Sequence, residues 1–102
     1  MSTNSFYALF NKASGRYYVN IGSSPSLAPR QWKESIKFPP QYSTTQTEEE
    51  GRGHLYRVQG LITDAIAYYA ENAPGDTIIK RFDNVDLSLV KVTETITFEE
   101  IT

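Results

Sequence analysis

Basic and aromatic side chains that could bind an anionic, planar ligand are concentrated in the first third of the chain. Guanidinium groups bind phosphate oxygens in a bidentate geometry, and aromatic rings stack on bases, so this mixture suits a nucleotide or a single strand of nucleic acid. The residues predicted to contact such a ligand are Arg16, Tyr18, Asn20, Arg30, Trp32 and Lys33. The alternative is that Tyr17 and Trp32 are core residues and that the basic side chains are ordinary surface charges.

Other residues that could do chemistry are sparse. His54 is the only histidine and the chain has no cysteine, so a thiolate nucleophile and a cysteine-containing zinc site are excluded. Adjacent glutamates, as at 48–50 and 99–100, point in different directions and rarely converge on one ion. Gly51-Arg52-Gly53 lacks the spacing of a phosphate-binding loop. We therefore predict no catalytic residue, no metal site and no cofactor.

The element expected to position the first candidate set is a β-hairpin from Phe6 to Gly22. Its two flanks are rich in aromatic and β-branched residues, which favour strands. The loop Asn11-Lys12-Ala13-Ser14-Gly15 ends in a glycine, where hairpin loops often need a positive φ. Strand alternation predicts two faces. Tyr17, Val19 and Ile21 are expected to enter the core, and Arg16, Tyr18 and Asn20 to point outward.

Two helices are predicted after the hairpin. A short one begins at about Pro29, places Trp32 and Ile36 on one face, and ends before Pro39-Pro40. The main helix covers about residues 48–72, because Thr47 and Glu50 form a capping box and apolar residues then recur at helical spacing. The polar segment 39–53 is predicted to be an exposed loop. Its last residues, 48–53, also belong to the predicted helix, because Gly51 and Gly53 could delay the helix start to near His54.

The C-terminal part of the chain is predicted to form strands. One covers Thr77 to Phe82, Asp83-Asn84 forms a turn, and residues 85–101 are expected to be one long bent strand rather than a second hairpin. The order of elements predicts a single α+β domain over residues 1–102. Its antiparallel sheet opens with the hairpin and is packed on one face by the main helix.

Charge and hydropathy limit the partners. The net charge is −2, but residues 1–47 carry +4 and residues 48–102 carry −6, which predicts a basic and an acidic face. A pI near 5.3 argues against double-stranded nucleic acid as the ligand. We found neither a signal peptide nor an apolar run of the roughly 18 residues that span a bilayer. We therefore expect a cytoplasmic protein with no membrane partner.

One stretch of the hairpin region, residues 17–30, resembles the first third of the GIY-YIG nucleases. The likeness lies in the run Tyr17-Tyr18-Val19-Asn20-Ile21-Gly22-Ser23-Ser24 and in the later Leu27 and Arg30. The resemblance implies metal-dependent phosphodiester cleavage by a tyrosine, the arginine and a later glutamate, for which Glu71 is the best candidate. The first half of the motif would fall on Phe6-Tyr7-Ala8, which lacks its glycine and isoleucine.

The chain as a whole is similar to small accessory proteins of bacteriophages that open with an Asn-Lys-x-x-Gly-x-Tyr-Tyr hairpin. That resemblance implies a host-takeover or counter-defence role, carried out in the host cytoplasm. Our hypothesis is a non-catalytic binding or inhibitory module that sequesters an anionic nucleotide-like ligand or blocks a host protein. The alternatives are a GIY-YIG-like nuclease and a structural protein that assembles, for example as a homo-oligomer, through a tyrosine-rich interface.

Overall fold

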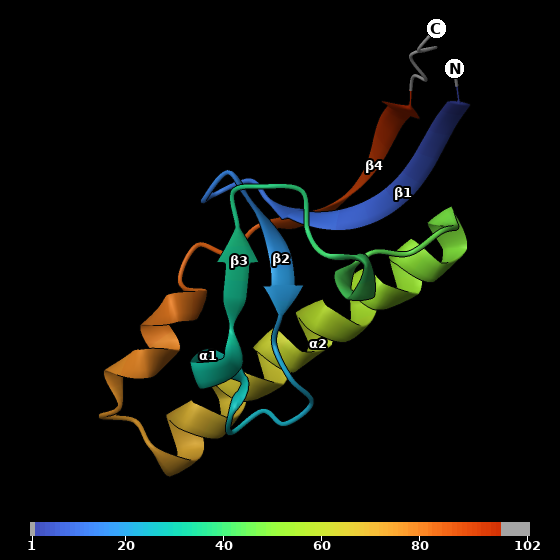
Figure 1. Cartoon of the computed structure of the whole chain (residues 1–102). Coiled ribbons are helices and arrows are strands. Elements are labelled where there is room, and N and C mark those ends of the chain that lie inside the picture. Colours follow the sequence, from blue (N-terminus) through green and yellow to red (C-terminus); the bar gives the residue numbers. More distant parts are fainter. Residues whose placement is uncertain (1, 97–102) are drawn as a thin grey trace, which may run out of the picture.

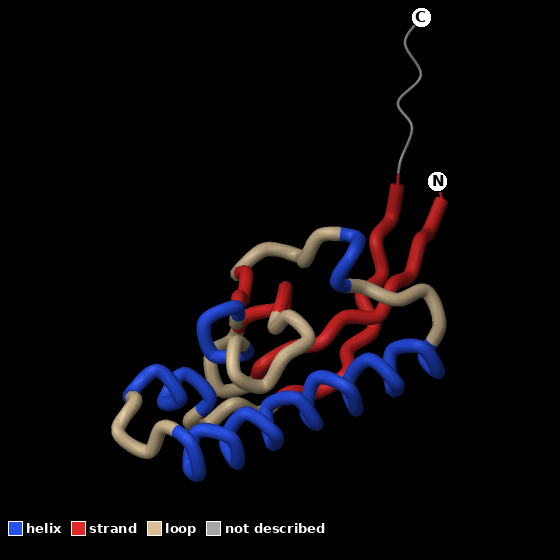
Figure 2. Tube along the Cα trace, turned by 90° about the horizontal axis from the view of Figure 1, so that it is seen from below, coloured by secondary structure: helices blue, strands red, loops and turns tan. Residues whose placement is uncertain are grey.

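The computed structural model describes residues 2–96 and contains a four-stranded antiparallel sheet in the order β3-β2-β1-β4 (Figure 1). The strands are β1 (Ser2–Asn11), β2 (Arg16–Asn20), β3 (Lys33–Ser35) and β4 (Leu87–Ile96). The long helix α2 (Glu48–Asn72) packs along one face of the sheet, as Figure 2 shows from below. The described residues also contain three short helices: α1 (Ala28–Gln31) and the 3₁₀-helices η1 (Gln41–Ser43) and η2 (Thr77–Phe82). The predicted α+β fold is confirmed.

The opening hairpin is confirmed, with a longer first strand than expected. Gly15 has a φ of 70°, and its N–H donates to the Asn11 carbonyl at 2.8 Å. The Asn11 side chain accepts a hydrogen bond from the backbone N–H of Ala13 at 3.1 Å, which closes the turn. Only Phe10 and Asn11 of β1 pair with β2, whereas all of β1 pairs with β4.

Helix α2 begins at Glu48, so residues 48–53 are helical and not part of a loop. The capping box forms: the Thr47 hydroxyl accepts from the Glu50 N–H at 3.2 Å and donates to the Glu50 carboxylate at 2.9 Å. The stabilisation of the helix start by this cap exceeds the destabilisation by the two nearby glycines. One of them, Gly51, is buried against β4, where an added Cβ would lie 2.7 Å from a methyl group of Leu89. The missing side chain lets the helix approach the sheet closely.

The core lies between α2 and the sheet face that it covers, which we call the inner face. The buried apolar side chains of α2 are Val58, Ile62, Ala65 and Tyr69, and Ile66 of the predicted stripe is exposed. The core also contains side chains of β1, β2, β4, α1 and η2 and of the residues next to them. The remaining members of the core are Leu9, Tyr18, Ile21, Ala28, Trp32, Phe82 and Leu87.

The prediction of a strand over Thr77 to Phe82 is wrong, because this segment is the 3₁₀-helix η2. The Asp76 side chain caps it by accepting from the Ile78 N–H at 3.1 Å. Its far end is fixed by Arg81, whose guanidinium donates to the carbonyls of Pro29 and Trp32 at 2.7 and 2.8 Å. These bonds tie η2 to α1 and place Phe82 in the core.

The predictions for residues 29–47 are partly wrong. Helix α1 ends at Gln31 and a strand follows, so Trp32 is buried while Ile36 is 73 % exposed, and the two do not share a helix face. The segment expected to be an exposed loop contains η1, and Thr45 pairs with Tyr7 of β1 through two backbone hydrogen bonds. Ser43 is buried there, so this segment is packed against the sheet.

The C-terminal region is one strand up to Ile96, the last described residue. Asn84 adopts a positive φ of 64° in the turn before β4, and β4 then pairs with β1 from Leu87 to Ile96 without a break. The rest of the predicted strand, residues 97–101, lies outside the described residues. No helix between residues 2 and 96 has the length and apolar character needed to cross a membrane.

Candidate functional site

Two of the predicted ligand-binding residues, Tyr18 and Trp32, lie in the core. Their rings are 5.7 Å apart, and Trp32 also packs edge-to-face on Phe82. The predicted facing of β2 is wrong at Tyr17 and Tyr18. The register of β2 shifts between Tyr18 and Asn20, which breaks the alternation and buries Tyr18, Val19 and Ile21 together.

A small polar cluster surrounds Tyr18 on the inner face. The His54 ring lies 5.3 Å from the Tyr18 ring, and its Nδ1 is 3.5 Å from the Arg57 guanidinium. Burial raises the pKa of Tyr18, although Arg57 opposes the shift by its charge and a hydrogen bond. Burial also lowers the pKa of His54, and the Arg57 charge lowers it further. Both rings are therefore neutral near pH 7, and the cluster anchors α2 to β2.

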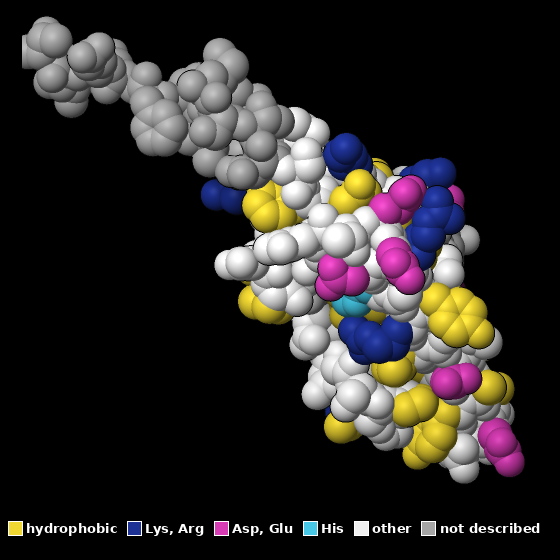
Figure 3. Space-filling model, turned by 90° about the vertical axis from the view of Figure 1, so that its right-hand side faces the viewer, with side chains coloured by type: hydrophobic (Ala, Val, Ile, Leu, Met, Phe, Trp, Pro, Cys, Tyr) yellow, Lys and Arg dark blue, Asp and Glu magenta, His cyan; other side chains and the backbone are white. Residues whose placement is uncertain are grey.

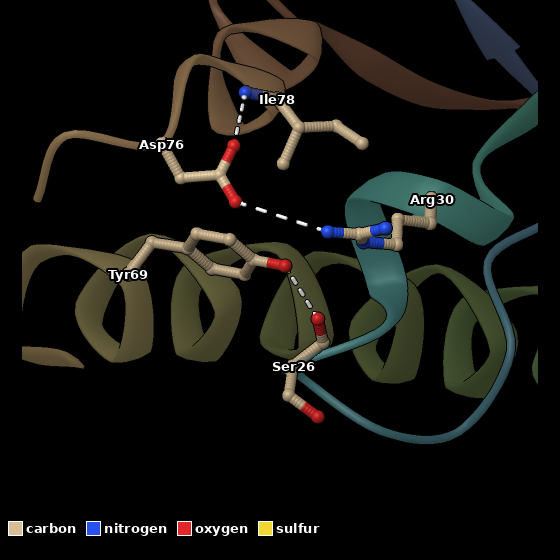
Figure 4. A network of polar contacts seen from close by, with 5 residues as sticks. All are labelled: Ser26, Arg30, Tyr69, Asp76 and Ile78. Atoms are coloured by element: carbon tan, nitrogen blue, oxygen red, sulfur yellow. Dashed lines mark hydrogen bonds and ion pairs between the residues drawn. The ribbon is translucent and has the colours of Figure 1, made fainter. Parts of the chain in front are cut away.

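Arg30 extends from α1 toward η2, as Figure 4 shows. Its guanidinium lies 3.9 Å from the Asp76 carboxylate, and the two side chains are 62 % and 35 % exposed. Nearby, the Tyr69 hydroxyl donates to the Ser26 carbonyl (Figure 4). These contacts join α1, α2 and η2, and the ion pair itself is weak at this exposure.

The remaining predicted site residues, Arg16, Asn20 and Lys33, are exposed. Asn20 and Lys33 are opposite each other on β2 and β3, while Arg16 is at the other end of β2. The Asn20 side chain is used locally, because it accepts from the Gly22 N–H at 3.2 Å. The structure thus brings together Tyr18 with Trp32 and Asn20 with Lys33, but it does not bring all six residues to one surface.

A cluster of aromatic rings that the sequence analysis did not single out lies on the opposite, outer face of the sheet. Phe10 of β1 packs edge-to-face on Tyr17 of β2 with ring centroids 5.2 Å apart. Phe38, which follows β3, contacts both Tyr17 at 6.0 Å and Phe6 at 6.2 Å. The four rings form a continuous row that joins β1, β2 and the segment after β3.

The segment after β3 carries three exposed apolar side chains, one of which, Phe38, belongs to this row. Ile36 is 73 % exposed, Phe38 is 41 % exposed and Tyr42 is 75 % exposed. Beside them is a pocket of about 330 Å³ lined by Phe6, Phe38, Pro39, Gln41 and Thr44. We give the name outer aromatic patch to the four rings together with the two exposed side chains near Phe38 in the chain; it comprises Phe6, Phe10, Tyr17, Ile36, Phe38 and Tyr42.

Two exposed lysines are close in the chain to Phe38 of the outer aromatic patch. Lys33 is on β3, and Lys37 lies between Ile36 and Phe38; both are exposed. Among residues 2–96 the ion pairs are Arg30–Asp76 and Arg52–Glu48, so neither lysine is paired with a described carboxylate. On the face of the molecule in Figure 3, by contrast, basic and acidic side chains are interspersed around the recessed histidine.

The sequence contains signals for this patch. Phe6 and Phe10 are four residues apart on a strand and therefore share a face. Ile36-Lys37-Phe38 stands directly before two prolines, and a residue that precedes a proline disfavours the helical conformation. What the sequence does not provide is the contact of Phe38 with Phe6, which are far apart in the chain.

No protein-family model matches the chain, and no match was found among curated proteins or solved structures. Within the described part of the chain, no three histidine, aspartate or glutamate side chains are grouped so that they could hold a metal ion. The candidate site is therefore defined by its geometry alone.

Proposed function

We propose that this chain is a non-catalytic binding module that blocks a partner protein by covering it with the outer aromatic patch. One observation carries the proposal: three exposed large apolar side chains, Ile36, Phe38 and Tyr42, lie within seven residues, and Phe38 is part of the row of aromatic rings. Contiguous exposed apolar surface is typical of protein-binding sites, and aromatic residues are enriched at their centres.

The character of the patch favours a protein over a nucleotide-like ligand. Tyr17 packs edge-to-face on both Phe10 and Phe38, so the row offers edges rather than a parallel slot for a base. The rings that were expected to stack on a base, Tyr18 and Trp32, are in the core. Lys33 and Lys37, which are close to Phe38 in the chain, would complement acidic residues around an apolar centre on the partner.

Two observations weigh against the nuclease alternative. Tyr18, which falls in the motif of that family, is buried, and its pKa is raised, so its hydroxyl is protonated and enclosed. Arg30 is oriented toward Asp76 of the segment that caps η2. A nuclease would need this arginine to face a glutamate across an open pocket.

The proposal is tested with a pair of matched tyrosine variants. Tyr42 in the patch and Tyr56 on the exposed side of α2 are 75 % and 81 % exposed, so both can be replaced by serine at little cost to folding. A lysate from the natural host is passed over the immobilised wild type, Tyr42→Ser, the double variant Ile36→Ser/Tyr42→Ser, and Tyr56→Ser. The retained protein is then identified, and its affinity for each variant is measured by calorimetry.

We expect the partner to bind wild type and Tyr56→Ser equally and to lose at least about tenfold in affinity for the patch variants. The further substitution of Lys33 and Lys37 by glutamate should slow association, most clearly at low salt. If the partner binds the double patch variant as tightly as the wild type, the outer aromatic patch is not the binding site. A retained nucleotide with no retained protein would instead favour sequestration.

A further inference from the structure

The strand β4 forms one margin of the sheet, and among residues 2–96 no strand pairs with its outer edge. It is the last strand in the order β3-β2-β1-β4, and Figure 1 shows no element beyond it. An edge strand presents a row of unpaired backbone N–H and C=O groups that another strand can pair with. This edge extends over the whole of β4, from Leu87 to Ile96.

The hydrogen-bond pattern identifies the backbone groups that point outward. The Lys12 N–H donates to the Asp86 carbonyl at 2.9 Å, so the hydrogen-bonded pairs of β1 and β4 include even-numbered residues of β4. The odd-numbered residues then point their N–H and C=O groups away from β1. The same rule holds on β1, where the N–H and C=O of Tyr7 bond to Thr45 on the side away from β4. The free groups of β4 belong to Leu87, Leu89, Lys91, Thr93 and Thr95.

Little in β4 protects this edge from pairing. Its register with β1 runs from Ser2↔Ile96 to Asn11↔Leu87 without a bulge, and the strand contains no proline. Lys91 is the only exposed charge in the described side chains of the strand. Beyond the pairing of β1 with β2 at Phe10 and Asn11 and with Thr45 at Tyr7, the outer parts of β1 and β4 are a two-stranded ribbon. Such a ribbon is marginally stable in water unless a further strand or layer supports it.

We propose that β4 pairs with β4 of a second copy of this chain, antiparallel about a two-fold axis, so that the sheet continues through the dimer. Free edges of this kind are self-complementary, and two-fold dimers are the commonest closed assemblies. The strand holds one lysine and one glutamate, so a second β4 is not repelled. This interface is separate from the outer aromatic patch and does not depend on the proposed function.

The geometry also fixes the register. A two-fold axis perpendicular to the sheet keeps every side chain on its own face, so the residue numbers of each pair must add to an even number. An axis at Lys91 would place two ammonium groups opposite each other and is disfavoured. Within the described part of β4, an axis at Val92 pairs residues from Ser88 to Ile96 and places Lys91 opposite Thr93, whereas an axis at Thr93 pairs 90–96. We therefore place the axis at Val92.

The test uses one substitution that removes only an outward donor. Thr93→Pro eliminates the outward N–H and leaves the bonds from Phe6 to Val92 in place, while Thr93→Ala removes the same side chain but keeps the N–H. Sedimentation of the full chain over a range of concentrations should show a dimer for wild type and Thr93→Ala. Thr93→Pro should be a monomer, with dimerisation weakened at least about tenfold. A wild type that stays monomeric, or a Thr93→Pro variant that dimerises as the wild type does, would overturn the proposal.

A second measurement needs no variant, so it stands even if Thr93→Pro fails to fold. In the monomer, the amides of residues 88, 90 and 92 are bonded to β1, while those of 89, 91 and 93 face solvent. We expect hydrogen exchange at 89, 91 and 93 to slow as the protein concentration rises, with 88, 90 and 92 slow throughout. Fast exchange of the odd-numbered amides at concentrations where sedimentation shows a dimer would place the interface elsewhere.

Discussion

The two faces of the sheet carry similar side chains but differ in what covers them. Tyr17 and Tyr18 are neighbours in the chain and point to opposite faces: Tyr18 is buried under α2, and Tyr17 stays half-buried in the row of rings on the outer face. The inner face is covered by a helix of 25 residues, and the outer face only by the irregular segment that follows β3. Aromatic residues therefore serve as core on one face and remain available for contact on the other.

The difference implies that stability and binding are separable in this fold. Side chains of the inner face fill the space between two regular elements, where any lost volume leaves a cavity. Side chains of the outer aromatic patch already contact water, so truncation there removes less buried area.

The largest expected effect is on the inner face. Leu9 is 0 % exposed in the centre of the core, so Leu9→Ala should lower the free energy of unfolding by about 2–5 kcal/mol. Phe38→Ala, at a side chain that is 41 % exposed, should cost about 1 kcal/mol or less. Urea denaturation of both variants measures the two values. Equal losses would mean that the outer face is as much a part of the core as the inner face.

The two adjacent tyrosines provide a finer comparison. Tyr18→Phe deprives Arg57 and the backbone of Ile21 of a hydrogen-bond acceptor inside the protein, so we expect a loss of about 1 kcal/mol. Tyr17→Phe should change the free energy of unfolding by only a few tenths of that amount, since its ring packing on Phe10 and Phe38 is kept. The same urea titrations give both numbers. A larger loss for Tyr17→Phe would reverse our assignment of the faces.

Two glycines of α2 distinguish the side of the helix that meets the sheet from the side that meets solvent. An added Cβ at Gly53 contacts nothing within 4 Å, so Gly53→Ala should stabilise the protein by about 0.5–1 kcal/mol. At Gly51 the same methyl group would lie 2.7 Å from Leu89, and the resulting repulsion should cancel the helix-propensity gain. Thermal unfolding followed by circular dichroism compares the two variants. An equal gain at both positions would show that α2 can move away from β4 freely.

The parts of this fold that the sequence predicts are those with local causes. The Asn11–Gly15 turn and the Thr47–Glu50 cap are decided by residues within a few positions of each other, and both are present as expected. The errors have non-local causes. The segment Thr77–Phe82 has the composition of a strand, but the Asp76 cap and the bonds from Arg81 to α1 make it a 3₁₀-helix.

The candidate site was harder to predict for the same reason. Alternation alone assigned Tyr17 to the core, because the register shift between Tyr18 and Asn20 has no local signal. Trp32 and Arg30 are close in the chain, yet one is buried against Phe82 and the other faces Asp76. The outer aromatic patch depends on the contact between Phe38 and Phe6, which are too far apart in the chain for a local pattern to predict it.

The smallest expected effect is confined to acid pH and concerns His54 on the inner face. Its pKa is lowered by burial and by Arg57, so the unfolded chain, with an ordinary value near 6.5, binds the proton more tightly than the native state does. The free energy of unfolding should therefore be complete above about pH 6.5 and should decrease as the pH falls through the native pKa. His54→Gln lacks this titration, and the carboxylates contribute equally to both proteins. The difference between wild type and His54→Gln, measured by urea denaturation from pH 8 to pH 5, should thus shift against the wild type on acidification. A constant difference would mean that the imidazole is as well solvated as an outer-face side chain, and the contrast between the two faces would not extend to the first turns of α2.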